Sequence, residues 1–134
     1  MVARLYARVL GIILALLAIV GFFIEDELLL DFMNVDIFLD VVRLLLAVLL
    51  IWVGFFRTSP QALNAVLGIT AVSYLGVGLL GLFDRELFGL LPTGLTGFDL
   101  VFHIVLGIAT VAVMLVPGRS GAGDAHTGDP RPRA

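Results

Sequence analysis

Five ionisable residues interrupt long apolar segments, and they fall into two groups. Asp36, Asp40 and Arg43 are spaced i, i+4 and i+7, so on a helix all three lie on one side. Asp99 and His103 repeat the i, i+4 spacing further along the chain. An ionised side chain in hydrocarbon costs on the order of 3 kcal/mol, so such groups normally face other helices or pair with one another. These five residues form the candidate polar cluster of this chain.

The composition places these residues in a membrane protein. The chain of 134 residues is 60% hydrophobic and 14% charged, and its mean hydropathy is +1.13. A soluble domain carries roughly 25% charged residues, and one of this size leaves about a third of its unfolded surface in contact with water. So many apolar side chains cannot be hidden in a soluble core, and the bilayer must cover the remainder.

Four apolar segments are long enough to cross the bilayer as helices, which takes about 20 residues each. Lipid offers backbone groups no partner, and the alternating pattern of a barrel strand is missing, so the spans must be helical. The first span lacks a small-x-small cleavage pattern, so we expect a retained helix and not a signal peptide. We predict an all-α integral membrane four-helix bundle over residues 1–116, with spans at about 5–24, 37–56, 62–83 and 98–116.

The distribution of arginine predicts the orientation. The segment from Glu25 to Asp36 carries five acids and no Arg, whereas Arg57 and the arginines near both termini lie on the opposite side of the spans. Translocation disfavours Arg in short loops. We therefore predict a multi-pass protein of the plasma membrane with both termini cytoplasmic. The tail over residues 117–134 has nothing apolar to bury and is expected to be disordered.

Two interpretations of the polar cluster are open. In the functional one, the residues line a vestibule near the outer face, where Arg43 bridges to Asp99 and His103 responds to outside acidity. In the structural one, Asp40 pairs with Arg43 and Asp99 with His103 along their own helices, and the side chains only position the helix ends. We favour the structural interpretation.

The residue set argues against catalysis, cofactors and nucleic acid. Cys is absent, which excludes thiolate catalysis and Cys-ligated metal sites. Ser73 has no His in its own half of the bilayer, and Asp99 with His103 supplies too few ligands for a metal ion. The basic residues are scattered, so no nucleic-acid surface is expected. We predict that the chain is not an enzyme and has no catalytic, cofactor-binding or metal site.

The chain also repeats itself. A shift of 57 pairs the Val-Leu-Gly-Ile run at residues 9–12 with the same run at 66–69, and a shift of 60 pairs Phe38 with Phe98. Each unit holds two spans, so both units enter the membrane in the same orientation. We predict two tandem two-helix repeats in which glycines let the helices approach closely.

These patterns resemble a known family. The segments V-L-G-I, V-D-I-F-L-D-V-V-R-L-L-L-A and L-T-G-F-D-L-V-F-H-I-V-L-G are similar to small four-span bacterial and archaeal proteins described as domain of unknown function 4383. The resemblance covers Ala3 to about Val116 and implies the same four-span fold with no established activity. The family's even helices commonly contain His and then Gly, as at His103 and Gly107, whereas Arg43 replaces the His of the first unit.

Two function hypotheses follow. The first is a non-enzymatic structural or accessory subunit that packs against itself or against a larger membrane protein, because about 130 residues in four spans leave little material for a substrate cavity. The second is a conduit or pH sensor for protons or small ions that uses Arg43, Asp99 and His103. The lipid bilayer is the partner in both.

Overall fold

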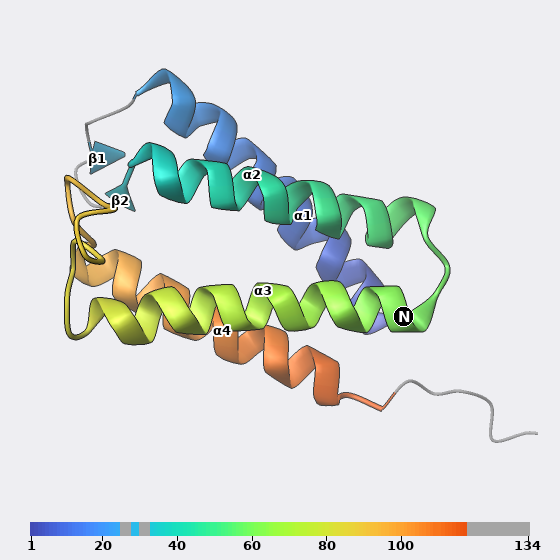
Figure 1. The fold of residues 1–134 in the computed structure, drawn as a ribbon. Helices are drawn as coiled ribbons and strands as arrows, with labels where there is room; N and C mark the ends of the chain where they lie inside the picture. Colours follow the sequence, from blue (N-terminus) through green and yellow to red (C-terminus); the bar gives the residue numbers. More distant parts are fainter. Residues whose placement is uncertain (25–27, 30–32, 118–134) are drawn as a thin grey trace, which may run out of the picture.

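The computed structural model describes residues 1–24, 28–29 and 33–117, and within this part the chain forms four long helices (Figure 1). The helices are α1 (Val2–Phe23), α2 (Ile37–Ile51), which a π-helical turn η1 (Trp52–Phe56) continues, α3 (Pro60–Gly81) and α4 (Gly97–Leu115). A short antiparallel ladder joins β1 (Leu28–Leu29) to β2 (Met33–Asn34) between α1 and α2. The predicted all-α fold class is confirmed.

Each helix has the length and composition of a membrane span. They are 19 to 22 residues long when η1 is counted with α2, and their mean hydropathies range from 1.8 to 2.4. Fewer than half of the residues in each apolar stretch are buried inside the bundle. The remaining side chains, such as Leu16, Val72 and Val105, point outward and are apolar, which is the surface that hydrocarbon requires.

The helices pack as two pairs. The ribbon places α1 across α2 and α3 across α4, and the two pairs contact each other much less than the helices do within a pair (Figure 1). Each pair corresponds to one of the predicted sequence repeats, although the repeat itself stays a prediction. The N-terminus, the turn between α2 and α3 and the end of α4 lie at the same end of the bundle, which we call the inner end.

Glycines set the closest approaches within each pair. A Cβ at Gly11 would meet Leu50 and Ile51 of α2 at 3.0 to 3.1 Å. A Cβ at Gly78 would lie 2.7 Å from the side chain and 3.1 Å from the backbone nitrogen of Ile104 on α4. Lipid provides no hydrophobic drive for association, so such close backbone packing is a main source of helix pairing.

Arginines of α1 donate hydrogen bonds to the last carbonyls of α2 and η1 at the inner end. The Nε atom of Arg8 donates to the Gly54 carbonyl at 2.7 Å, and Arg4 donates to the carbonyls of Val53 and Thr58 at 3.1 Å, and also to that of Arg57. A helix end leaves its last carbonyls without helical partners, and these guanidinium groups supply donors for them. The π-helical turn is thus held from the neighbouring helix.

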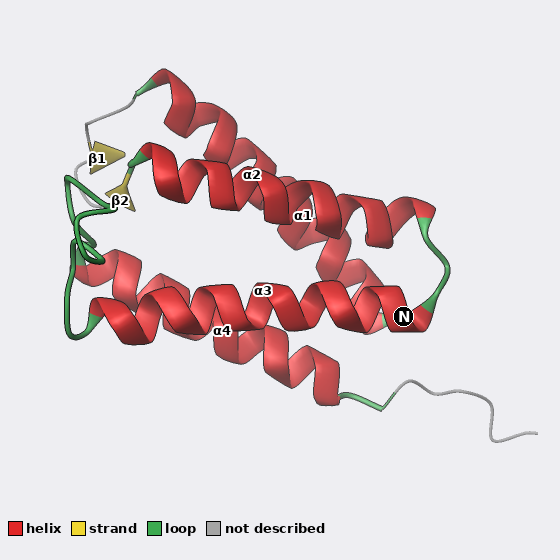
Figure 2. Cartoon of the chain, viewed as in Figure 1, coloured by secondary structure: helices red, strands yellow, loops and turns green. Residues whose placement is uncertain are grey.

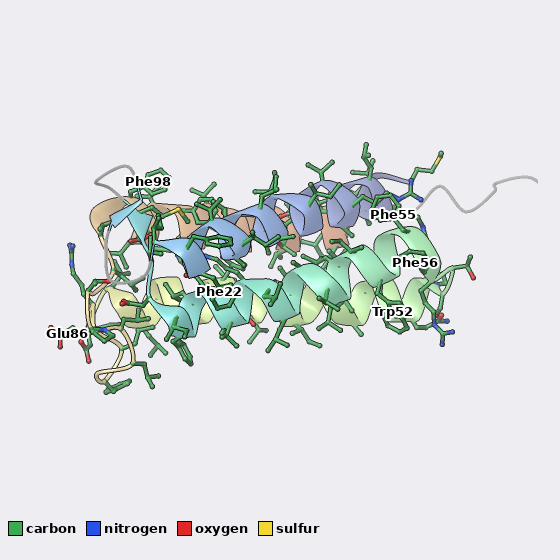
Figure 3. The ribbon with its side chains drawn as sticks, turned by 90° about the horizontal axis from the view of Figure 1, so that it is seen from above. Phe22, Trp52, Phe55, Phe56, Glu86 and Phe98 are labelled. Atoms are coloured by element: carbon green, nitrogen blue, oxygen red, sulfur yellow. The ribbon has the colours of Figure 1, made fainter. Side chains whose placement is uncertain are left out.

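Aromatic side chains surround the same end. Trp52, Phe55 and Phe56 lie together there, far from Glu86 and Phe98 at the opposite end (Figure 3). The guanidinium of Arg8 lies 4.9 Å from the centre of the Phe55 ring. This arrangement is typical of an aromatic belt at a membrane interface.

The segment between α3 and α4, which we call the second outer loop, lies at the opposite end of the bundle together with β1 and β2 (Figure 2). We call this end the outer end. Leu87, Leu91 and Leu95 are buried against Leu39 of α2 and Leu100 of α4. Phe88 next to Leu87 is exposed, and both residues adopt a positive φ. The loop therefore covers the outer end with its leucines.

The glycine contacts lead to a first prediction. Gly78→Val should lower the free energy of unfolding in detergent by about 1–3 kcal/mol, because the added methyl groups overlap Ile104. The matched variant Gly76→Val, two residues away, should unfold like the wild type in a detergent that keeps the chain monomeric, since within the chain a Cβ at that position meets nothing within 4 Å. Thermal unfolding followed by circular dichroism measures both, and equal effects would contradict the packing described here.

Candidate functional site

The structure buries all five residues of the polar cluster near the outer end. Their relative exposures range from 0 to 3%. Asp36 precedes α2, Asp40 and Arg43 lie in its first two turns, and Asp99 and His103 occupy the corresponding turns of α4. The cluster is thus enclosed beneath the folded second outer loop.

Arg43 pairs with Asp40 along its own helix, as the structural interpretation predicted. The Nη1 atom donates to Asp40 Oδ1 at 2.8 Å, and both side chains are buried. Gly21 of α1 lies directly against the carboxylate, so that any side chain at that position would overlap it. The close crossing of α1 and α2 therefore depends on a glycine that makes room for the ion pair.

Asp36 fastens the second outer loop to α2. Its carboxylate accepts hydrogen bonds from the Thr93 hydroxyl at 2.8 Å and from the Thr93 backbone nitrogen at 3.3 to 3.4 Å. The two residues are 57 positions apart, and sequence analysis did not single out Thr93. A threonine in a loop carries no pattern that would reveal a distant carboxylate partner.

Asp99 organises the beginning of α4. Its carboxylate accepts from the Thr96 backbone nitrogen at 2.9 Å, while Thr96 Oγ1 accepts from the Asp99 backbone nitrogen, which completes a capping box. His103 Nδ1 lies 2.7 Å from the Asp99 carbonyl oxygen. The expected pairing of Asp99 with His103 thus runs through the backbone carbonyl and not through the carboxylate.

Tyr74 of α3 also lies at the cluster. Its ring stacks on His103 with a centroid distance of 5.0 Å and an interplanar angle of 29°. Tyr74, Arg43 and His103 line a common space between α2, α3 and α4. The i, i+4 pattern could not reveal Tyr74, because it lies on a different helix from the charged residues.

A second polar contact links the helix pairs in the inner half. The Tyr6 hydroxyl of α1 and Thr110 Oγ1 of α4 lie 2.8 Å apart, and Thr110 also donates to the Leu106 carbonyl at 2.7 Å. Since Thr110 uses its proton on that carbonyl, Tyr6 is the donor to Thr110. The contact joins residues from the two predicted repeats.

Metal binding finds no support in the described part of the chain. Residues 1–24, 28–29 and 33–117 contain no group of three or more His, Asp or Glu side chains that could hold an ion. The acidic segment at Glu25 to Glu27 and the predicted disordered tail from residue 118 onward lie outside the described residues.

Comparison with known proteins bears on the first helix pair. Residues 1–56 match the family described as Domain of unknown function (DUF4383). The predicted resemblance to this family is confirmed. The match spans α1, α2 and η1, which together form the first predicted repeat, and it is shorter than the expected coverage to Val116. No curated protein and no solved structure matches the chain.

The buried ion pair leads to a second prediction. Asp40→Asn and Arg43→Gln should each destabilise the folded chain, because each leaves a buried charge without its opposite charge. The double variant should be more stable than the sum of the single effects predicts, with a coupling of about 1–3 kcal/mol. Unfolding in detergent gives the four free energies, and strictly additive effects would contradict an energetically coupled pair.

Proposed function

We propose that this chain is a non-enzymatic structural or accessory subunit of the plasma membrane, with both termini in the cytoplasm. The proposal is based on one observation: the residues of the polar cluster bind partners within the chain itself. Asp36 binds Thr93, Asp40 binds Arg43, and the Asp99 carbonyl binds His103. Because these groups hold the outer end together, the protein offers other molecules mainly its outward helix faces.

The orientation is supported by the charge and aromatic pattern of the inner end. Arg4, Arg8 and Arg57 all lie there, next to Trp52 and Phe55. Cytoplasmic loops retain arginine, and aromatic rings favour the headgroup region. Both features agree with an inner end that faces the cytoplasm.

Helix α3 has the outward face best suited to a protein partner. It is the least hydropathic span, at 1.8 against 2.2 to 2.4 for the others. Ala65, Ile69, Val72 and Gly76 follow one face by their spacing, and a Cβ at Gly76 would meet nothing within 4 Å. A glycine inside a helix costs about 1 kcal/mol relative to alanine. Within the described part of the chain, no close contact requires a glycine at position 76. A partner helix that packs closely against this face would require one.

This proposal predicts the effect of enlarging the α3 face. The chain extracted from its native membrane in mild detergent should migrate as a homo-oligomer or as a complex with a larger membrane protein. Gly76→Leu should weaken that association about tenfold or more, because leucine keeps a partner backbone from approaching. Native mass spectrometry and cross-linking of the purified material measure the complex.

The matched control enlarges another small, exposed residue on a different helix. Ala112→Leu on α4 should leave the association unchanged. A clean monomer in every mild detergent, or the same loss in both variants, would contradict the proposal.

A second candidate function is a conduit or pH sensor for protons or small ions. The observation in its favour is the meeting of Arg43, Tyr74 and His103 around one buried space. Histidine is the side chain best suited to respond to pH changes near neutrality. In this candidate the enclosed cluster would respond to outside acidity when the loop above it opens.

The two candidates differ in the expected effect of His103→Ala. A sensor or conduit loses its response to outside acid in reconstituted vesicles, while the variant still inserts and folds, because the titrating ring is gone. The matched control is His126→Ala, which removes the other histidine of the chain. If proton flux in the His103 variant equals that of the wild type, the second candidate is wrong.

A further inference from the structure

We propose that the inner end of the bundle binds the phosphodiester headgroup of an anionic phospholipid, such as phosphatidylglycerol, in a hollow beside Arg8. This site lies apart from the polar cluster at the outer end and rests on neither proposed function. It follows from the hydrogen-bond donors that Arg8 keeps, the lining of the hollow and the charges at this end.

Arg8 presents donors that the protein does not use. Its Nε atom donates to the Gly54 carbonyl at 2.7 Å, and its guanidinium carbon lies 4.9 Å from the centre of the Phe55 ring. No described residue accepts a hydrogen bond from either Nη atom. A guanidinium carries five N–H donors in a rigid fork that suits phosphate oxygens. The group is therefore held in position while most of its donors face outward to a ligand.

The depth of Arg8 determines which acceptors can reach it. Arg8 lies in the second turn of α1, about 9 Å from the start of the helix at 1.5 Å per residue. That position is near the edge of the hydrocarbon layer, where an ionised side chain without a partner is strongly disfavoured. A lipid phosphate is the anionic acceptor that the membrane itself supplies at this level.

A hollow beside Arg8 has room for a headgroup. It measures about 370 Å³ and is lined by Arg4 and Arg8 together with Met1, Val2 and Leu5. Sites for small ligands usually measure about 300–1,000 Å³. Val2 and Leu5 are exposed apolar side chains. The hollow thus offers arginine to a phosphate and apolar surface to the glycerol and the first acyl carbons, a combination that suits an amphipathic lipid.

The charge of this end favours an anionic lipid over a zwitterionic one. The acidic residues of the described part of the chain all lie at the outer end, and they are Asp36, Asp40, Asp84, Glu86 and Asp99. No described carboxylate can therefore bind the ammonium group of phosphatidylcholine at the inner end. The Phe55 ring, which could attract a cation, already contacts the guanidinium of Arg8. An anionic headgroup brings no such unpaired cation.

The other inner-end arginines differ from Arg8. Arg4 donates to the carbonyls of Val53, Arg57 and Thr58, so it adds positive charge but has few donors left. The guanidinium of Arg57 lies 5.5 Å from the centre of the Trp52 ring, and Arg57 does not line the hollow. Replacing Arg8 therefore separates a specific site from the general attraction between basic residues and an anionic membrane.

The test uses the full chain in lipid nanodiscs that contain phosphatidylglycerol and phosphatidylcholine in equal amounts and with the same acyl chains. Native mass spectrometry counts the lipids that stay bound when the chain is released. The wild type should retain phosphatidylglycerol about fivefold over phosphatidylcholine. Arg8→Gln should lower this preference to about twofold or less, because the phosphate loses its charged, paired donors.

The matched control is Arg57→Gln, which removes the same charge from the same end but outside the hollow. It should keep most of the wild-type preference. Equal retention of both lipids by the wild type would overturn the proposal. The same loss in both variants would do so too, since that result is expected of general electrostatic attraction alone.

A second variant keeps the proposal testable if Arg8→Gln does not fold. Arg8→Lys preserves the charge, but a single ammonium group lacks the fork that bonds Gly54 and a phosphate at once. Its preference for phosphatidylglycerol should therefore fall below that of the wild type. An unchanged preference would show that charge alone is sufficient, and the proposed site would be wrong.

The soluble headgroup distinguishes a lipid from a free phosphate. Glycerophosphoglycerol carries the same phosphodiester without acyl chains, so it cannot use the apolar walls of the hollow. It should not displace the bound phosphatidylglycerol from the wild type. Displacement at a concentration equal to that of the lipid would contradict a lipid as the ligand.

Discussion

The cost of holding charge inside the bilayer governs the outer half of this protein. An ionised side chain at depth costs on the order of 3 kcal/mol by insertion scales, and removing one partner of a buried pair costs about 3–5 kcal/mol. The chain meets this constraint inside its own fold. Asp40 lies against Arg43, and Gly21 leaves room for that carboxylate at the crossing of α1 and α2. Glycine is therefore required at position 21 of α1 because the Asp40 carboxylate of α2 occupies the space that a side chain would need.

The same constraint decides where the second outer loop lies. Thr93 binds Asp36, and the leucines of the loop enter the gap between α2 and α4, so that one segment satisfies a carboxylate and shields the cluster from water. At the inner end, the carbonyls of η1 lack helical partners, and Arg4 and Arg8 of α1 donate hydrogen bonds to them. Both ends are thus closed by polar contacts between elements, while the middle of the bundle relies on close packing.

Much of the site's local chemistry could be predicted from sequence. Arg43 and Asp40 are three positions apart on one helix, so their pairing was one of the two alternatives that the sequence offered, and the structure shows this ion pair. The partners of Asp36 and Tyr74 could not be found in that way. Thr93 is 57 residues from Asp36, and Tyr74 meets His103 from another helix. The cover over the cluster could not be predicted for a related reason, because only the folded loop shows that these side chains are enclosed.

The amino-acid sequence alone was enough to predict that the chain forms four membrane-spanning helices, and the predicted ends of each helix agree with the structure to within three residues. It could do so because span length and apolar composition are set by bilayer thickness and by the need of every backbone group for a partner, and both act locally along the chain. The pairing of the helices, the donor that binds each carboxylate and the enclosure of the charges became known only from the folded arrangement. Those outcomes depend on close approaches between distant segments, for which lipid supplies no general driving force.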